Sequence, residues 1–597
     1  MRDRQNDDRP ILAVPAHQVT RRRFLRLSGL GVAGVAAGLL VSCQQAPAAP
    51  AKPAEPAKPA EAAKPAESKP AAPAAAPAKP AEAAKPAEAA KPAAAQPAAA
   101  PKPGGTIVVA VASDPGPLEN SINLGSDTQR YLIEVYDRLI LEDLSEKAEI
   151  APLKPGLATS WSVSPDGLQY TFKLRENVKF HDGSAFDAEA VKFNIERLTK
   201  PDHQFYYERG AGATKIVYGR VAGVEVVDPM TVRVQLSQPY ANFTDVLSLP
   251  IASIASPAVI KQYGNNDHPA HASGTGPFKF VEHQKGTKFV LARNPDYWGG
   301  APPLDGYIVR PIAEPTAAVS ALQGNEVQMV CTAPPDTVAL LQARPELATQ
   351  LSKMPLTFCW NFNVREKPFD DKRVRQAINW AIDRETYCKD IMKGLAVPAK
   401  SVFGPSMAAY DPNLKGYSYD LDKAKALLRE AGLENGFTFK LQTAKSNGYD
   451  QLALYAKDQL AKLNITVETE FFETQTMSAN ANKEGTLPGV GAIGWSWNAN
   501  PPFNFDRFFT SSFGPPNGVN FGFYSNPEVD KGLEEVAKTI DREARLNLYR
   551  KLDAIVTEDA AWAFFYHPIE PRITTNKLTW VNANSNWYTL RNASLSS

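Results

Sequence analysis

The segment LATSWSVSPDGLQYTFKLRENVKFHDGSAFDAEAVKFNIERL, residues 157–198, contains the clearest local structure in the chain. Its Asp166-Gly167 dipeptide is a turn signal, and apolar and polar residues alternate over 170–174. This pattern predicts a β-hairpin with one buried face and one solvated face. Apolar residues at helical spacing follow over 190–198. They predict a helix after the hairpin.

Other segments predict a mixed α/β fold. Residues 106–112 form a continuous apolar run, which is typical of a strand covered on both faces. Residues 437–441 and 465–472 have strand patterns, and a helix-period segment over 452–463 lies between them. A strand, a helix and a strand in this order indicate a βαβ unit with parallel strands. A further aromatic strand is predicted at 562–566.

Four segments together resemble the family 5 solute-binding proteins of ABC importers, the peptide- and nickel-binding group. They are the opening segment 157–198, GTGPFKFVEHQKGTKFVLARNPDYWGGAPPLD at 274–305, DDKRVRQAINWAIDRE at 370–385 and YDLDKAKALLREAG at 419–432. The resemblance implies an α/β, two-lobed fold of the periplasmic-binding-protein type II class, with an extra subdomain in the first lobe. A disordered Ala/Pro/Lys/Glu linker precedes this fold.

The resemblance also gives expected domain boundaries. The first lobe is expected at 104–147, 272–313 and 564–597, with the inserted subdomain at 148–271. The second lobe is expected at 314–563, and the chain crosses between lobes near the aromatic strand.

The N-terminus has the features of an export signal. Arg21 and Arg22 precede an uncharged, mildly apolar segment, residues 27–41. The arginine pair followed by Phe-Leu resembles a twin-arginine signal. Leu-Val-Ser-Cys, ending at Cys43, resembles a lipobox. We therefore expect residues 1–42 to be removed and an acylated Cys43 to anchor the mature chain to a membrane.

Residues 43–103 are dominated by units such as Ala-Lys-Pro-Ala-Glu. Small residues and recurrent proline bury too little apolar surface to fold, and mixed lysine and glutamate keep the segment solvated. We predict a disordered tether that holds the folded domain away from a membrane or through a wall.

Composition and motifs argue against several functions. The 597 residues carry a formal net charge of +1, so we expect no attraction to nucleic acid. GxxxxGK[ST], HExxH and GxSxG are absent, which argues against an enzyme or a bound cofactor. His268 and His271 form an HxxH in a proline-containing loop, so we expect no metal site. Cys331, Cys359 and Cys388 lack metal-ligand spacing.

The candidate ligand-binding stretch is GWSWNANPP, residues 494–502. It combines two indoles and two amides, Trp495, Trp497, Asn498 and Asn500, with a Pro-Pro stop that ends a strand in a non-helical corner. Buried tryptophans are common in cores, so a structural role is the alternative. In peptide-binding members of the family, the equivalent segment carries an aspartate that pairs with the peptide amine. The uncharged Asn498 departs from that pattern.

Further candidate contacts follow predicted strands. Trp360, Asn361 and Asn363 lie at the end of an apolar strand, with a structural role as the equal alternative. Asp114 follows the first strand, where ligands of α/β sheets bind, although a turn residue is the commoner role.

The family resemblance implies a monomeric extracytoplasmic receptor, anchored through Cys43, that closes its lobes on a solute and delivers it to an ABC permease. A peptide is the preferred solute. The alternatives are an oligosaccharide or other non-peptide solute, with nickel a lesser option, and a secreted hydrolase on the same scaffold.

Overall fold

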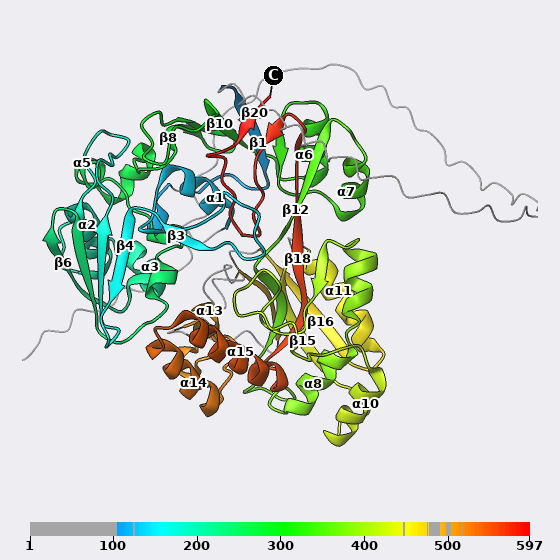
Figure 1. Ribbon diagram of the computed structural model, residues 1–597. Coiled ribbons are helices and arrows are strands. Elements are labelled where there is room, and N and C mark those ends of the chain that lie inside the picture. The colour runs from blue at the N-terminus through cyan, green and yellow to red at the C-terminus, as the bar shows by residue number, and fades with distance from the viewer. Residues whose placement is uncertain are drawn as a thin grey trace, which may run out of the picture. The chain divides into compact units, whose positions relative to one another are not determined.

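The structure is a computed structural model, and its described part is residues 104–116, 118–122, 126–445, 448–473, 476, 490–496, 503–515 and 518–596. Two α/β lobes share one long strand, β18 (Trp562–Thr575), and the first lobe carries an extra subdomain (Figure 1). The predicted signal and tether lie outside the described residues. Within that part, no helix is long and apolar enough to cross a membrane.

The subdomain is a four-stranded antiparallel sheet covered by helices. Its strands follow the order β4-β5-β7-β6, and Gly167, with a φ of +70°, lies in the turn between β4 and β5. The predicted hairpin and the helix after it are confirmed. Phe172, Val191 and Val232 are fully buried between the sheet and α2. The elements are β4 (Ala158–Val163), β5 (Gln169–Leu174), β6 (Val221–Asp228), β7 (Thr231–Leu236), α2 (Ala188–Thr199), α3 (Glu208–Tyr218), α4 (Phe243–Val246) and α5 (Pro257–Asp267).

The first lobe is built on β1, which lies between two parallel neighbours. β1 pairs with β10 on one side and β11 on the other. Ile107 and Val109 are fully buried on one face of β1, and Ala110 is buried on the opposite face. The predicted doubly covered strand is therefore confirmed. The elements are β1 (Thr106–Val111), β8 (Phe278–Gln284), β9 (Lys288–Arg293), β10 (Gly306–Pro311), β11 (Met329–Val330), β12 (Leu347–Lys353), α1 (Ser126–Val135), α6 (Pro315–Gln323) and α7 (Pro335–Gln342).

The sheet of the second lobe contains the predicted βαβ unit. β15 and β16 pair in parallel and α11 connects them. Asp420 caps the helix before this unit by accepting a hydrogen bond from the Lys423 amide. The elements are β13 (Leu356–Phe362), β14 (Ala396–Pro398), β15 (Thr438–Ala444), β16 (Thr466–Phe472), β17 (Val490–Ser496), α8 (Lys372–Ala381), α9 (Arg384–Thr386), α10 (Leu421–Glu430) and α11 (Tyr449–Ala461).

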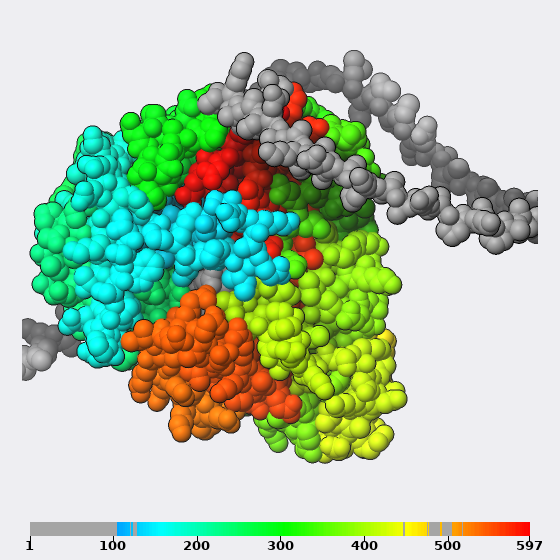
Figure 2. All heavy atoms as spheres, viewed as in Figure 1, coloured from blue at the N-terminus to red at the C-terminus, as the bar shows by residue number. Residues whose placement is uncertain are grey.

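A helical region completes the second lobe: α13 (Phe503–Phe509), α14 (Pro527–Lys538) and α15 (Arg542–Glu558). Asn526 and Asp541 cap α14 and α15 with their side chains. In the space-filling view this orange region lies against the cyan subdomain (Figure 2). Short remaining elements are β2 (Ile140–Glu142), β3 (Leu153–Pro155), β19 (Leu578–Thr579), β20 (Ser594–Leu595), η1 (Asn120–Ile122), η2 (Pro250–Ala252), η3 (His268–His271), η4 (Tyr387–Ile391) and η5 (Ser511–Phe513).

The boundary between the lobes differs from the predicted one. The sequence predicts that the second lobe begins at residue 314, but β11 pairs with β1 and β12 pairs with the second half of β18. Ala318 of α6 packs in one core cluster with Ala110 and Ile573. Residues 315–353 therefore belong to the first lobe. Helical periodicity reveals that a helix has a buried face, but it does not reveal which sheet covers that face.

Candidate functional site

The carboxyl ends of the parallel strands form one edge of the sheet in the first lobe. Val111 at the end of β1 lies opposite Pro311 at the end of β10. On the other side, Ala110 lies opposite Val330, the last residue of β11. Open α/β sheets bind ligands beyond this edge.

The second lobe has an equivalent edge. β15 and β16 end together, with Ala444 opposite Phe472, and β17 runs parallel to β15. β13 is antiparallel to β17 and begins at this edge, where Leu356 lies opposite Ser496.

β18 joins the two edges. Tyr566 lies opposite Phe358 near the start of β13, and Ile573 lies opposite Val330 at the end of β11. The intervening residues 567–572 span about 20 Å at ~3.3 Å per residue. The two carboxyl edges thus lie at opposite ends of this crossing segment, and the space between them is the candidate solute site.

Buried charges fix the crossing segment. Arg130 of α1 donates to both carboxylate oxygens of Glu570, at 2.9 and 3.0 Å, and Arg572 donates to Glu570 Oε2 at 2.9 Å. Arg572 is fully buried and also donates to Asn582 Oδ1 at 2.6 Å and to the Ser585 carbonyl at 3.1 Å. Burial raises the pKa of Glu570, but the two guanidinium groups outweigh burial and hold it below its ordinary value. The cluster ties α1 and the C-terminal segment to β18.

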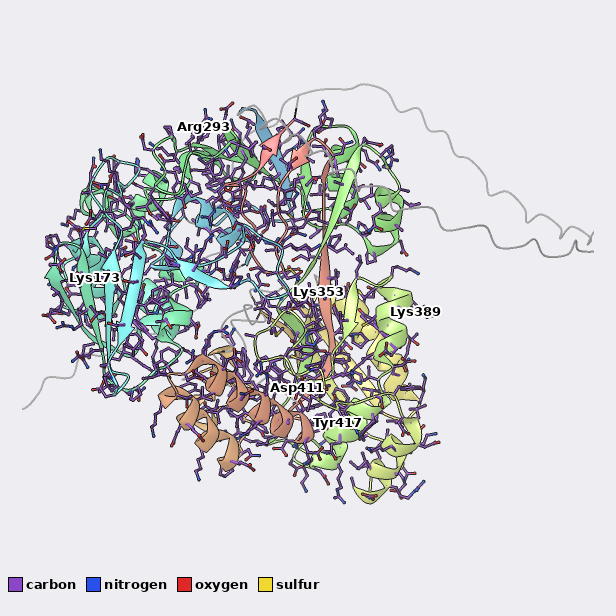
Figure 3. All side chains as sticks on the ribbon, viewed as in Figure 1. Lys173, Arg293, Lys353, Lys389, Asp411 and Tyr417 are labelled. Carbon is purple, nitrogen blue, oxygen red and sulfur yellow. The ribbon has the colours of Figure 1, made fainter. Side chains whose placement is uncertain are left out.

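Lys353, labelled in Figure 3, ends β12 beside this crossing. Its amide donates to Asn584 Oδ1 at 2.9 Å, and its ammonium contacts Glu149 at 2.6 Å. Asn584 in turn donates to the Ala148 carbonyl at 3.1 Å. These contacts hold the start of the predicted subdomain segment to the end of β12 and to Asn584 of the C-terminal segment.

Asp114 lies just beyond β1, at the first carboxyl edge. Its two carboxylate oxygens lie 3.1 and 3.2 Å from His283 Nε2, and each side chain is 22% exposed. The structure therefore places Asp114 in a partly exposed hydrogen-bonded contact with His283 of β8, at the first carboxyl edge.

Trp495 lies in β17 opposite Thr357, at the second carboxyl edge; its side chain and residues Trp497, Asn498 and Asn500 are outside the described part. Trp360 lies opposite Ala492, about 10 Å further along the strand. Its indole is fully buried and packs against Phe439 and Phe565. The position of Trp360 therefore matches its structural alternative, which is packing in the core.

Asn361 and Asn363 lie at the end of β13 that is remote from the carboxyl edge. Asn363 forms a local turn, donating to Glu366 Oε1 at 2.8 Å and accepting from the Arg365 amide at 3.2 Å. The buried Asn361 amide has no hydrogen-bond partner among the described residues. The structure does not bring either residue close to Trp495.

The histidines and cysteines singled out in the sequence are buried or paired elsewhere. His268 is buried against Glu119, and His271 stacks on Tyr263 with ring centroids 3.7 Å apart. Cys331, Cys359 and Cys388 are buried in the core, and none of them forms a disulfide with another described residue. The described residues contain no cluster of three metal-ligating side chains.

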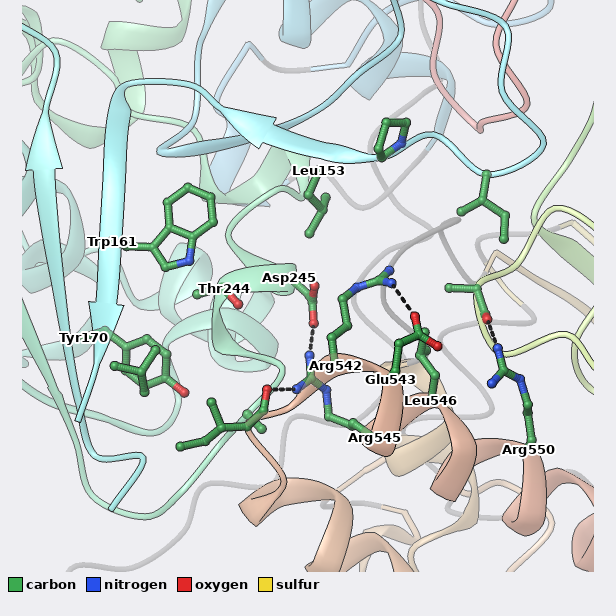
Figure 4. Close-up of a pocket in the computed structure, with 16 residues that line it drawn as sticks. Leu153, Trp161, Tyr170, Thr244, Asp245, Arg542, Glu543, Arg545, Leu546 and Arg550 are labelled. Carbon is green, nitrogen blue, oxygen red and sulfur yellow. Dashed lines mark hydrogen bonds and ion pairs between the residues drawn. The ribbon is translucent and has the colours of Figure 1, made fainter. Parts of the chain in front are cut away.

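A cavity of about 660 Å³ lies between the subdomain and the second lobe (Figure 4). Leu153, Trp161 and Asp245 line it from one side, and Arg542, Arg545 and Leu546 from the other. The sequence did not predict this site, because its lining residues are up to 400 positions apart and share no local pattern. The cavity is separate from the carboxyl edges, since none of its lining residues lies at the end of a parallel strand.

A model of the bacterial extracellular solute-binding proteins, family 5 Middle, matches residues 152–516. The chain belongs to this family. Family 5 proteins are solute-binding receptors of ABC importers, so the resemblance seen in the sequence and the expected two-lobed fold are both confirmed.

Relatives and solved structures extend this family 5 assignment over most of the chain. The glutathione-binding protein GsiB of Pectobacterium atrosepticum is 34% identical over 415 residues, which cover 68% of this chain and 79% of GsiB. The periplasmic binding protein DppA of Helicobacter pylori, solved with the peptide STSA, has a TM-score of 0.72 and 28% identity, and the match covers 83% of this chain and 99% of DppA. The oligopeptide-binding protein AppA of Bacillus subtilis shares the fold, with a TM-score of 0.70 and 24% identity over 83% of this chain and 100% of AppA.

Proposed function

We propose that this family 5 protein captures a peptide between its two lobes and delivers it to an ABC-type import permease. The observation that carries the proposal is the 34% identity to GsiB over 79% of that protein, whose name assigns it a peptide-like solute, glutathione. The 28% identical DppA was solved with a peptide as well. Two carboxyl edges joined by β18, with the β12–β13 connection running beside it, support capture by lobe closure.

The export signal and tether complete the proposed role. Arg21 and Arg22 direct export, an acylated Cys43 anchors the protein to the outer face of a membrane, and the segment to residue 103 gives the receptor reach. The protein acts as a monomer and releases its solute chemically unchanged.

A solute panel tests the proposal directly. Purified full-length protein is heated with glutathione, the tetrapeptide Ser-Thr-Ser-Ala, oligosaccharides or nickel with histidine, and compounds that co-purify are identified by mass spectrometry. A peptide at one hundred times its Kd is expected to stabilise the folded protein by about 2.7 kcal/mol. A response only to oligosaccharides or nickel would contradict a peptide receptor, and turnover of the bound compound would indicate a hydrolase.

The variant Asn498→Asp tests the solute contact that the sequence predicts. A carboxylate at this position is expected to favour peptides with a free amine over the same peptides acetylated at the N-terminus by about five- to tenfold, because a charge-assisted hydrogen bond is stronger than a neutral one. Calorimetry of both peptides measures the ratio. Asn413→Asp adds the same charge at an exposed site of the second lobe and should leave the ratio unchanged. If the ratio is also unchanged in Asn498→Asp, Asn498 does not contact the amine of the peptide.

A further inference from the structure

The subdomain and the second lobe meet at a junction between two separate hydrophobic cores. Phe243 and Val246 of α4 belong to the core of the subdomain, whereas Leu546 and Tyr549 of α15 belong to the core of the helical region. Polar interfaces between separately packed units are typical of parts that move relative to one another. The contacts that hold this junction are indeed polar.

The main contact is a buried ion pair. Arg545 Nη2 of α15 donates to Asp245 Oδ2 of α4 at 2.8 Å, and the side chains are only 4% and 6% exposed (Figure 4). Arg545 Nη1 donates to the carbonyls of Thr539 and Ile540, both at 2.9 Å. These bonds within the second lobe fix the guanidinium group in position to receive the carboxylate of the subdomain.

Two further hydrogen bonds cross the junction beside the ion pair, and a third extends one of them within the second lobe. Asn242 Nδ2 donates to the Tyr549 hydroxyl at 2.7 Å, and this hydroxyl donates to Asp506 Oδ1 at 2.7 Å. The Ala241 amide donates to the Ala537 carbonyl at 2.9 Å. Residues 241–245 thus bind α14 and α15 through both backbone and side chains.

We propose that Asn242, Asp245, Arg545 and Tyr549 form a latch that holds the closed form of the receptor. The proposal rests on the proposed function, in which the lobes close around a solute. Asp245 and Arg545 are hydrated when the junction is open and lose water only when it closes, so their pairing belongs to the closed form alone. Because apparent solute affinity scales with the closed fraction, these residues position the lobes for binding without touching the solute.

The latch is tested by measuring two quantities for each variant: the distance between two spin labels on either side of the junction, and the affinity for glutathione. Spin labels are placed on Gln238→Cys and Glu534→Cys, which are exposed on either side of the junction, in a full-length Cys43→Ser chain. Burial raises the pKa of Cys331 to about 11 and that of Cys388 to about 12, so the core thiols react little.

The variant Asp245→Asn leaves the buried Arg545 without its charge partner. We expect the distance distribution of the solute-free protein to move to longer values, and binding of glutathione to weaken about tenfold or more. Asn242→Ala is expected to act in the same direction and provides a second variant if Asp245→Asn fails to fold.

Two controls show whether the effect comes from the contact between Asp245 and Arg545 or from the loss of any carboxylate in the subdomain. Asp228→Asn removes an exposed carboxylate of the same subdomain and should change neither distance nor affinity. Replacing both partners, as Asp245→Leu with Arg545→Met, removes the unpaired buried charge. We expect the label distance distribution to return toward that of the wild type and the affinity for glutathione to return to within about threefold of it, because an apolar pair tolerates burial.

Unchanged distances in Asp245→Asn and Asn242→Ala would show that the junction is permanent and would overturn the latch. The distance measurement needs no solute. If the wild-type chain binds neither glutathione nor Ser-Thr-Ser-Ala, the proposed peptide receptor fails, while the distances still decide whether the latch exists.

Discussion

Replacing Arg572 by methionine is expected to lower the free energy of unfolding by about 3–5 kcal/mol, because it removes the cation that satisfies several buried acceptors at once. Arg572 is fully buried and donates to Glu570, to Asn582 and to the Ser585 carbonyl. Methionine fills a similar volume but donates no hydrogen bond, so these acceptors lose their partner in the interior. Guanidinium unfolding followed by circular dichroism measures the loss.

The matched control for this substitution is Arg293→Met. Arg293 lies on the first lobe (Figure 3), pairs with Asp305 at 3.0 Å, and is 35% exposed. An exposed pair of this kind contributes less than about 1 kcal/mol. Equal unfolding midpoints for the two variants would mean that the charge cluster on β18 does not stabilise the join between the lobes.

Replacing Trp360 by alanine is expected to destabilise the second lobe by about 3–5 kcal/mol, since it opens a large cavity between β13 and the helices that cover it. The indole is fully buried and packs against Phe439 and Phe565. At a temperature where the variant remains folded, its affinity for a solute should stay within about threefold of wild type. Thermal unfolding and calorimetry on the same sample separate the two effects.

Trp360→Phe is the milder companion substitution, with an expected cost of about 1–3 kcal/mol because most of the aromatic contact remains. A large loss of affinity in either variant, without a loss of stability, would show that Trp360 contacts the solute. Such a result would support the solute contact that the sequence predicts for Trp360 from its position at the end of an apolar strand.

The sequence predicts those elements whose determinants are local. The Asp166-Gly167 hairpin and the strands and helix of the βαβ unit from β15 to β16 follow from patterns within short segments, and the structure confirms them. A family resemblance spread over four segments also places the chain in its fold, because the spacing of those segments reflects the whole architecture.

Features that depend on distant partners are not predictable from one sequence. Arg130 and Glu570 are 440 positions apart, and Asp245 and Arg545 are 300 positions apart. Neither pair leaves a local pattern. The same reason explains why the sequence predicts residues 315–353 in the second lobe, whereas β11 and β12 pair with strands of the first-lobe sheet. It also explains why Trp360 is a candidate contact in the sequence, since an apolar run does not show which end of its strand faces a ligand.

The sharing of β18 by both lobes limits how they can move (Figure 1). Because β18 is hydrogen-bonded into both sheets, the lobes cannot slide apart, and any opening must bend or twist residues 567–572 together with the adjoining β12–β13 connection at 353–356. When one lobe rotates about this crossing segment, each of its atoms moves by an amount that grows with its distance from β18. The contact between Asp245 and Arg545 is made by a peripheral subdomain, where a small change of angle at the strand is enough to separate two charges.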